Sequence, residues 1–306
     1  MTQKKKVVVT GGAGFIGSNL VAELLARDFE VHVIDTLING TREHVPSPAQ
    51  LHEVDILDTK ASAAIMKEAS AVFHLAALPR VSYSVEYPIE SNRVNVEGTI
   101  SMLVAARDAK VGRVIYSASG SAYGNQETTP FHEGLPASPV NPYGLQKYIG
   151  ELYLKMFAEV YGLSTVSLRY FNIYGPNMDP KGPYGLAVAK LLEQKSQGMP
   201  LTIVGDGTQT RDFTHVRDAV RANLLAMESS CIGRGEVINI GTGRNIPVNY
   251  LADLIDGGVG LRETLPSRVE AHDSLADNAR AKELLGWEPQ IAIEEGIAEL
   301  KKKFGI

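Results

Sequence analysis

The stretch Val7-Val8-Val9-Thr10-Gly11-Gly12-Ala13-Gly14-Phe15-Ile16-Gly17 decides the fold. Its apolar run predicts a buried strand, its glycines a tight turn, and the residues that follow an amphipathic helix. Gly11 permits the turn, Gly14 lets the backbone approach a pyrophosphate, and Gly17 allows close packing of helix on strand. The helix N-terminus offers unpaired N–H groups and a partial positive charge to phosphates. Three glycines alone can merely shape a turn, so the prediction of a dinucleotide site needs support from the rest of the chain.

Short apolar runs alternate with amphipathic stretches over the first half of the chain. Strands separated by helices imply right-handed crossovers and a parallel sheet with helices on both faces. The predicted strands are Lys6–Thr10, Glu30–Asp35, His52–Asp55, Ala71–Ala76, Arg113–Ser117 and Ser164–Arg169, and the predicted helices are Phe15–Arg27, Arg93–Ala109 and Tyr143–Tyr161. We therefore expect an α/β protein with a Rossmann-type doubly wound parallel sheet.

The alternation loosens beyond Tyr174-Gly175-Pro176-Asn177, where proline and glycine cluster. Helices and short strands follow without strict order. We expect a dinucleotide-binding Rossmann domain over residues 1–170, with parts of 210–245. A smaller mixed α/β C-terminal lobe over residues 171–306 is expected to bind the substrate.

Composition narrows the class of protein. The chain has 306 residues, a net charge of -5 and 44% hydrophobic residues, which is typical of an ordinary globular protein and unlike a general nucleic-acid binder. A single cysteine, Cys231, excludes an intramolecular disulfide and fits a reducing cytoplasm. No stretch reaches the ~20 apolar residues of a membrane-spanning helix. The histidine spacing indicates no metal site. Taken together, these features predict a cytoplasmic protein with no metal, membrane or nucleic-acid partner.

Asp35 strengthens the prediction of a dinucleotide site. It closes the second predicted strand, where a carboxylate can bind both hydroxyls of the adenosine ribose. Its charge repels a 2′-phosphate, which favours NAD over NADP. Arg42 is the nearby residue that could accommodate NADP instead, although it also fits a solvated loop charge. The other predicted cofactor residues of this half are Phe15, Ile16, Asn39, Gly40, Asp55, Ile56, Leu75, Ala76 and Ala77.

Tyr143 and Lys147 lie four residues apart, one turn along the same face of a predicted helix. A free tyrosine has a pKa of ~10 and is a poor base at neutral pH. A neighbouring ammonium and an oxidised nicotinamide both stabilise the phenolate, so the pair is expected to supply a base with a pKa nearer 7. The same spacing also occurs by chance at protein surfaces.

A cluster of small hydroxyl residues, Ser117-Ala118-Ser119-Gly120-Ser121-Ala122-Tyr123-Gly124, ends the preceding strand. Ligands of parallel sheets bind at the carboxyl ends of the strands, so this cluster is expected to face the cofactor. A serine hydroxyl there can bond a substrate oxygen and relay its proton to Tyr143. Small polar residues can also simply end a strand.

These motifs resemble those of the extended short-chain dehydrogenases/reductases and, within them, the UDP-sugar 4-epimerases. The resemblance covers essentially the whole chain. Its further motifs are His74-Leu75-Ala76-Ala77, Asn95-Val96-Glu97-Gly98-Thr99, Arg169-Tyr170-Phe171-Asn172-Ile173-Tyr174-Gly175-Pro176, Gly205-Asp206-Gly207-Thr208-Gln209-Thr210-Arg211-Asp212-Phe213, Asn239-Ile240-Gly241-Thr242-Gly243 and Leu284-Leu285-Gly286-Trp287-Glu288-Pro289.

The resemblance implies a role for individual residues. Ser119 corresponds to the catalytic hydroxyl, Tyr143 to the base and acid, and Lys147 to the residue that binds the nicotinamide ribose. Asn95 resembles an asparagine that supports the active-site strand, although it equally fits a helix-start cap. Ser117 and Tyr170 complete the implied cofactor site, and the implied substrate residues are Ser119, Tyr143, Asn172, Val188, Thr202, Val204, Arg211, Arg268, Glu270 and Ser274.

Members of this family catalyse different reactions on the same fold, so the reaction has to be inferred from the residues of the site. Related dehydratases and decarboxylases carry an acidic residue shortly before the tyrosine that corresponds to Tyr123, whereas this chain has Gly120, Ser121 and Ala122. The resemblance therefore implies epimerisation at C4 of UDP-glucose and UDP-galactose through a 4-keto intermediate with bound NAD. The small residue Ser274 implies that UDP-GlcNAc and UDP-GalNAc also fit. A reductase or decarboxylase of the same family, and a non-catalytic dinucleotide sensor, are the alternatives.

The resemblance also implies a homodimer, formed by pairing the helices Arg93–Ala109 and Tyr143–Tyr161 of two copies. The apolar residues expected on these helices are Val94, Ile100, Leu103, Val104, Leu152, Leu154 and Phe157. They could equally pack on their own sheet.

Overall fold

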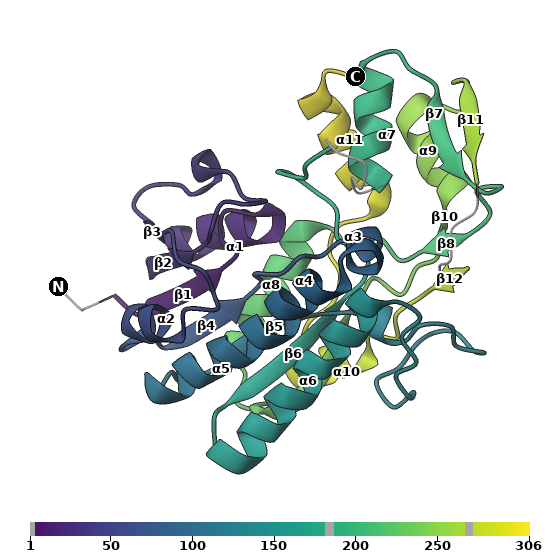
Figure 1. The fold of residues 1–306 in the computed structure, drawn as a ribbon. Coiled ribbons are helices and arrows are strands. Elements are labelled where there is room, and N and C mark those ends of the chain that lie inside the picture. Colours follow the sequence, from purple (N-terminus) through teal and green to yellow (C-terminus); the bar gives the residue numbers. More distant parts are fainter. Residues whose placement is uncertain (1–3, 181–186, 267–271) are drawn as a thin grey trace.

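Seven parallel strands form the central sheet of the protein (Figure 1). The structure is a computed structural model that describes residues 4–180, 187–266 and 272–306. In spatial order the strands are β3 (Gln50–His52), β2 (Glu30–Ile34), β1 (Lys6–Thr10), β4 (Ala71–His74), β5 (Val114–Ser119), β6 (Thr165–Tyr170) and β9 (Arg234–Ile240). The strand order reverses between β1 and β4, which is where ligands of such sheets bind. The expected Rossmann-type doubly wound sheet is confirmed.

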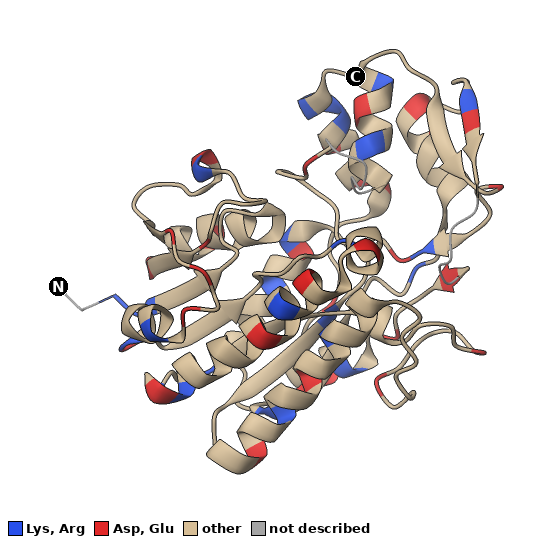
Figure 2. Ribbon diagram, in the orientation of Figure 1, with Lys and Arg blue, Asp and Glu red and all other residues tan. Residues whose placement is uncertain are grey.

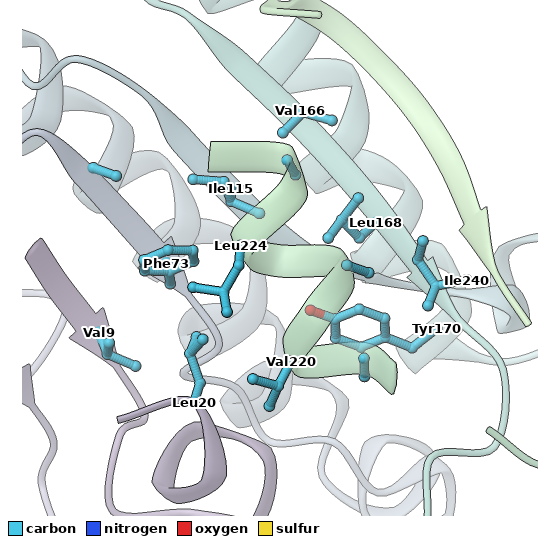
Figure 3. Close-up of a cluster of buried hydrophobic side chains, with 14 of the residues drawn as sticks. Val9, Leu20, Phe73, Ile115, Val166, Leu168, Tyr170, Val220, Leu224 and Ile240 are labelled. Carbon is cyan, nitrogen blue, oxygen red and sulfur yellow. The ribbon is translucent and has the colours of Figure 1, made fainter. Parts of the chain in front are cut away.

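The two faces of the sheet are covered by different helices, because successive strand residues point to opposite sides. Val7 and Val9 pack with α1 (Phe15–Ala26) and α8 (Val216–Glu228), in the cluster drawn in Figure 3. Val8 points to the opposite side, where α2 (Thr59–Met66), α5 (Gly98–Asp108) and α6 (Pro142–Tyr161) cover the sheet. All three valines are fully buried, as their continuous apolar run predicts for a parallel strand.

Two predicted elements differ substantially from the observed ones, whereas the others agree to within two residues at either end. The third strand is Gln50–His52 rather than His52–Asp55, so Asp55 lies in the loop that follows it. The helix predicted from Arg93 is part of a longer helical run, made of α4 (Pro88–Asn92), a π-helical turn (Arg93–Glu97) and α5. The short α3 (Val81–Glu86) precedes this run.

A smaller lobe, built from segments before α8 and after β9, has its own hydrophobic core. Its described elements are α7 (Ala187–Ser196), β7 (Leu201–Val204), β8 (Thr210–Arg211), β10 (Ile246–Pro247), α9 (Val248–Asp256), β11 (Arg262–Leu265), β12 (Asp273–Ser274) and α11 (Ile293–Phe304). β11 pairs with β7, and β8 lies between β10 and β12. The lobe is therefore of mixed α/β type, and Figure 1 shows it beyond the carboxyl ends of the strands.

Between β12 and α11 of the lobe, the chain returns to the sheet domain. Helix α10 (Ala279–Leu285) and Trp287 pack in the same core as α1 and α8. The Trp287 indole is fully buried and its Nε1 donates to the carbonyl oxygen of Asp218, at 2.9 Å. This segment belongs to the stretch that the sequence analysis assigns to the lobe, so the lobe and the sheet domain do not separate at one point of the sequence.

Charged side chains of both signs are interspersed along the outer helices α5 and α6 (Figure 2). None of the helices in the described part of the chain is both long and apolar enough to cross a bilayer. Residues 4–180, 187–266 and 272–306 contain no group of three histidine, cysteine or acidic side chains arranged to hold a metal ion. The cytoplasmic location stays a prediction.

Candidate active site

The glycine turn between β1 and α1 is as tight as its sequence predicts. Gly11 has a φ of +71°, which side chains rarely adopt, and a Cβ there would lie 2.7 Å from the backbone nitrogen of Ala76. A Cβ on Gly17 would lie 2.1 Å from the carbonyl oxygen of Gly11. Both positions therefore require glycine. Gly11 allows the close approach of the segment after β4, and Gly17 allows α1 to pack on the turn.

The N-terminus of α1 opens onto this turn. Gly14 occupies its N-cap position, where no described side chain caps the helix, and the first turn from Phe15 carries no acidic residue. The first amides of a helix lack partners within the helix, and its dipole favours an anion. This end of α1 therefore fits the diphosphate of a dinucleotide.

Asp35 lies directly beside the turn. Its carboxylate accepts hydrogen bonds from the backbone nitrogens of Ala13, at 3.0 Å, and Leu37, at 2.8 Å. A Cβ on Gly40 would lie 2.8 Å from Cβ of Ala13, so the loop of Asn39 and Gly40 packs against the turn. These contacts fix the carboxylate at the end of β2, where the ribose of a dinucleotide would lie.

The other predicted cofactor residues follow the neighbouring strands. The backbone nitrogen of Leu75 donates to the Thr10 carbonyl oxygen, and that of Ala76 donates to Thr10 Oγ1, at 3.2 Å. Asp55 accepts from its own loop, at the backbone nitrogen of Leu57. Ile56 is buried against α5, and Ala77 follows Ala76 in the loop after β4.

Arg42, the residue that could favour NADP, forms an exposed ion pair with Glu53. The turn, the open helix end and the Asp35 carboxylate together fit NAD. These residues would hold its diphosphate and adenosine, and the bound group would supply hydride transfer.

Two elements bring the predicted catalytic residues together. Ser119 is the last residue of β5, and Tyr143 is in the first turn of α6. That helix begins with Asn141, whose Oδ1 accepts from the backbone nitrogen of Gly144 at 2.9 Å, followed by a proline at the first helical position. The backbone nitrogen of Tyr143 also donates to Ser84 Oγ, at 3.0 Å. The start of α6 is therefore capped by its own Asn141 and fixed against α3.

Lys147 is buried one turn beyond Tyr143. Its Nζ donates to the carbonyl oxygen of Ser117, at 2.7 Å, and lies 4.8 Å from the centre of the Tyr116 ring. Burial lowers the pKa of Lys147 to about 7, and the charge of Glu151 opposes this shift. The ammonium therefore titrates close to neutral pH.

Tyr143 differs from expectation. Burial raises its pKa to about 12, although a hydrogen bond with Ser119 opposes this rise. The expectation of a phenol with a pKa nearer 7 is therefore not met by the protein's own groups, because desolvation of the phenolate outweighs the hydroxyl beside it. The positive charges near the ring have to supply the remaining stabilisation of the phenolate.

Asn95 supports the site from the π-helical turn. Its side chain accepts from the backbone nitrogen of Leu78, at 2.7 Å, and donates to the carbonyl oxygen of Leu78 and to Oε1 of Gln146. It lies inside a continuous helical run, so its interpretation as a helix-start cap is wrong. The residue ties the loop after β4 to α6.

Two of the predicted substrate residues lie where β6 and β8 end. Asn172 Nδ2 donates to the carbonyl oxygen of Asp212 at 3.2 Å, and the Arg211 guanidinium donates to the carbonyl oxygens of Thr210 and His272. Ser274 is in β12, which pairs with β8 so that Ser274 lies beside Arg211. The structure thus brings Arg211 and Ser274 together.

The remaining predicted ligand residues differ in how exposed their side chains are. Thr202 and Val204 are partly exposed on β7, whereas Val188 of α7 is only 2% exposed in the core of the lobe. Tyr170 is also buried, with its hydroxyl bonded by Asn223 Nδ2 at 2.7 Å, and Figure 3 shows its ring beside α8. Arg268 and Glu270 lie outside the described residues.

Sequence reasoning missed a buried ion pair beneath the site. Nε and Nη2 of Arg169 donate to the two carboxylate oxygens of Glu151, at 2.8 and 2.6 Å, and both side chains are almost fully buried. Glu151 lies one helical turn beyond Lys147, and that spacing is the one signal in the sequence. Nothing in the sequence alone shows that Arg169 reaches it from β6.

Comparison with known proteins identifies the family. Residues 7–241 match the model of the NAD dependent epimerase/dehydratase family. The chain is 38% identical to a UDP-glucose 4-epimerase of Mycolicibacterium smegmatis over 98% of both chains. Two solved structures are similar over almost their whole length. The UDP-glucose 4-epimerase of Thermotoga maritima with UDP-glucose has a TM-score of 0.93 and 40% identity, covering 98% of both chains. The UDP-N-acetylglucosamine 4-epimerase of Methanobrevibacter ruminantium, in complex with UDP-N-acetylmuramic acid, has a TM-score of 0.92 and 35% identity, covering 99% of both.

The chain therefore belongs to the NAD-dependent epimerase/dehydratase family. It is an NAD-dependent enzyme of the epimerase type, as the resemblance of its motifs implies.

Proposed function

We propose that the enzyme is a UDP-sugar 4-epimerase that inverts C4 of UDP-glucose and UDP-galactose, and also of UDP-GlcNAc and UDP-GalNAc. One observation carries the proposal: Ser119, Tyr143 and Lys147 meet at the carboxyl edge of the sheet, beside a turn, Gly120–Ala122, that has no carboxylate. The similar proteins named above act on UDP-glucose or UDP-GlcNAc by their names, which supports the same chemistry here.

The chain's residues divide the work between proton transfer and charge stabilisation. Bound NAD would supply the hydride acceptor for oxidation at C4 and the hydride donor for the return. The Ser119 hydroxyl orients the sugar O4, and Tyr143 removes its proton as C4 becomes a ketone. Once the 4-keto sugar has rotated to present the opposite face of C4, Tyr143 returns the proton to the same oxygen. The Lys147 ammonium favours the phenolate form in which Tyr143 accepts this proton, and to which Tyr143 reverts when it gives the proton back.

The turn after β5 disfavours dehydration and decarboxylation. Both reactions need a further acid or base after the oxidation, and related enzymes carry a carboxylate in this turn. Here a Cβ on Gly120 would lie 3.2 Å from the Phe171 ring, so this position has little room for an acidic side chain. The Ser119 Oγ accepts from the backbone nitrogen of Ser121 at 3.1 Å, which holds the turn closed on the hydroxyl. An oxidation followed by its reversal needs no additional group.

Inversion requires that the nucleotide be held firmly while the sugar turns. Arg211 and Asn172 are suited to hold the diphosphate, because a guanidinium presents planar paired donors to phosphate oxygens. Ser274 lies beside Arg211, and its side chain is small. We therefore expect the pocket to admit the N-acetyl group.

The test of the activity uses purified protein with each of the four UDP-sugars and no added cofactor, analysed by proton NMR. Interconversion within each pair, without net change in NADH absorbance, is the expected result. Tyr143→Phe should lose about 10²–10⁴-fold in turnover while retaining bound NAD. Stoichiometric release of NADH, a dehydrated or decarboxylated product, or undiminished turnover of Tyr143→Phe would contradict the proposal.

Substrate range is tested by Ser274→Tyr, with Ser274→Ala as the matched control. The tyrosine should lower kcat/KM for UDP-GlcNAc and UDP-GalNAc and leave that for UDP-glucose and UDP-galactose within about threefold. The alanine should preserve both pairs, because it keeps the space. If the tyrosine leaves the selectivity unchanged, Ser274 does not set the substrate range.

We also propose that the enzyme is a homodimer. Three of the residues predicted for the dimer interface pack in the core of their own domain instead: Leu103, Leu154 and Phe157. Four of the exposed apolar residues of α6 lie instead along one face: Leu145, Leu152, Met156 and Val160. Such a stripe is suited to pairing with a second copy of the same helix.

A further inference from the structure

Asp212 is a fully buried acidic residue that directly follows Arg211. Its Oδ1 accepts from the backbone nitrogen and the hydroxyl of Thr242, at 2.7 and 2.6 Å. Its Oδ2 accepts from the backbone nitrogens of Gly243, at 2.9 Å, and Ala276, at 3.2 Å. One carboxylate thus satisfies four donors.

These donors come from separate parts of the fold. Thr242 and Gly243 follow β9 of the central sheet, whereas Ala276 follows β12 of the lobe. The carbonyl oxygen of Asp212 accepts from Asn172 Nδ2, which adds the segment after β6. A Cβ on Gly241 would lie 2.8 Å from Asp212 Oδ2, so the segments are also packed closely. Asp212 is therefore the common partner of segments from both the sheet domain and the lobe.

The donor set requires an ionised carboxylate. Each oxygen accepts two hydrogen bonds, and a protonated acid or an amide would instead present a hydrogen toward another donor. Burial raises the pKa of Asp212, while its hydrogen bonds to Thr242, Gly243 and Ala276 oppose that rise. Loss of the charge would leave backbone amides buried without an acceptor, which is costly.

The residues held in this way are those assigned above to the substrate. Arg211 is adjacent to Asp212 in the chain, Ser274 precedes Ala276 by two residues, and Asn172 Nδ2 donates to the backbone carbonyl oxygen of Asp212. We propose that Asp212 is the positioning residue of the nucleotide-diphosphate subsite, and that its carboxylate sets the spacing of Arg211, Asn172 and Ser274. This inference rests on the proposed function.

A buried aspartate that only stabilises the fold is the competing explanation, and the chain contains a matched control. Asp218 is also buried, and its carboxylate accepts from the backbone nitrogens of Gln290 and Ile291 and from Arg221. It fastens the C-terminal segment to α8. These partners, Arg221, Gln290 and Ile291, lie outside the three segments joined by Asp212.

The experiment compares Asp212→Asn with Asp218→Asn in the NAD-loaded enzyme. It measures UDP affinity by calorimetry, KM and kcat for UDP-glucose, bound NAD, and the thermal midpoint. Asp212→Asn should weaken UDP binding and raise KM about tenfold or more, with kcat and NAD content within about threefold. Asp218→Asn should lower the thermal midpoint and leave UDP affinity and KM unchanged.

Thr242 provides a second variant if Asp212→Asn does not fold. Thr242→Val removes one donor and should weaken UDP binding about two- to fivefold, whereas Thr242→Ser keeps the hydroxyl and should restore it. Equal effects of the two aspartate variants on UDP affinity, or unchanged affinity in both Asp212→Asn and Thr242→Val, would overturn the inference. Wild-type enzyme that binds UDP but epimerises no UDP-sugar would instead overturn the proposed function. Wild-type enzyme that binds no UDP would overturn both.

Discussion

Thr10 and His74 are hydrogen-bonded across β1 and β4, with Thr10 Oγ1 2.8 Å from His74 Nδ1. The opposite ring nitrogen, Nε2, lies 3.1 Å from Thr99 Oγ1, whose hydroxyl donates to the Asn95 carbonyl oxygen. Because the Thr99 hydrogen is already used, Nε2 must donate and Nδ1 must accept from Thr10. The chain of donors therefore assigns a neutral imidazole, protonated on Nε2.

This assignment predicts loss of stability in acid. Burial lowers the pKa of His74 to about 3, with the charge of Lys147 acting in the same direction. Below pH ~6.5 the unfolded chain binds a proton at this histidine that the folded protein does not, so stability is present above that pH and declines as the pH falls toward 3. Urea unfolding between pH 8 and pH 5 should show the decline.

Removal of the histidine tests its share of this effect. His74→Gln should be less stable than the wild type at pH 8, but its stability should fall less steeply between pH 6.5 and pH 5. The difference in slope should reach up to ~1.4 kcal/mol per pH unit, the value for one proton. Identical slopes for the two proteins would show that His74 titrates normally.

Asp35 should decide the affinity for NAD. Asp35→Asn keeps the shape of the side chain but replaces an acceptor with an amide and removes the charge for the ribose hydroxyls. We expect NAD affinity to fall about 10–100-fold, with weaker discrimination against NADP, as measured by calorimetry. Glu53→Gln is the control, because it changes an exposed carboxylate nearby and releases Arg42. It should leave NAD affinity unchanged, and an equal loss in both variants would contradict a specific role for Asp35.

Lys147 should be required for turnover rather than for folding. Lys147→Met removes the ammonium that stabilises the phenolate and should lower kcat about 10²–10³-fold. Its thermal midpoint should stay the same or rise, because an ammonium is costly to bury. Lys155→Met, at an exposed position of the same helix with an ion pair to Glu159, should retain full activity. A kcat within fivefold of wild type for Lys147→Met would argue against the assigned role.

The exposed stripe on α6 should govern association. Leu152→Glu combined with Met156→Glu places charges in the middle of the stripe, so the protein should elute as a monomer in size-exclusion chromatography with light scattering. The change should not unfold it, since both side chains are exposed in the single chain. A wild-type protein that is monomeric at micromolar concentration, or a double variant that remains dimeric, would contradict this interface.

The sequence predicts those features that depend on local pattern. The turn from Gly11 to Gly17 and the position of Asp35 follow from neighbouring residues, and the structure places them as expected. The pKa of Tyr143 does not follow from neighbouring residues. The spacing indicates that Lys147 is nearby, but it does not show the burial that raises this pKa. Asp212 adjoins Arg211 in the sequence, whereas the partners of its carboxylate come from residues 242–243 and 276. Such long-range pairing is decided by the packing of the lobe on the sheet.

The Glu151–Arg169 ion pair should behave as a single unit. Removing one partner leaves a buried charge without its counterion, so Glu151→Gln should destabilise the fold by about 3–5 kcal/mol. Arg169 also lies 4.4 Å from the centre of the Tyr123 ring, and its removal disturbs that contact as well. Replacement of both, as in Glu151→Leu with Arg169→Met, should recover much of the loss, because desolvation of the two charges is then avoided. Urea unfolding of both single variants and the double variant measures the coupling, and additive losses would show that the pair does not act together.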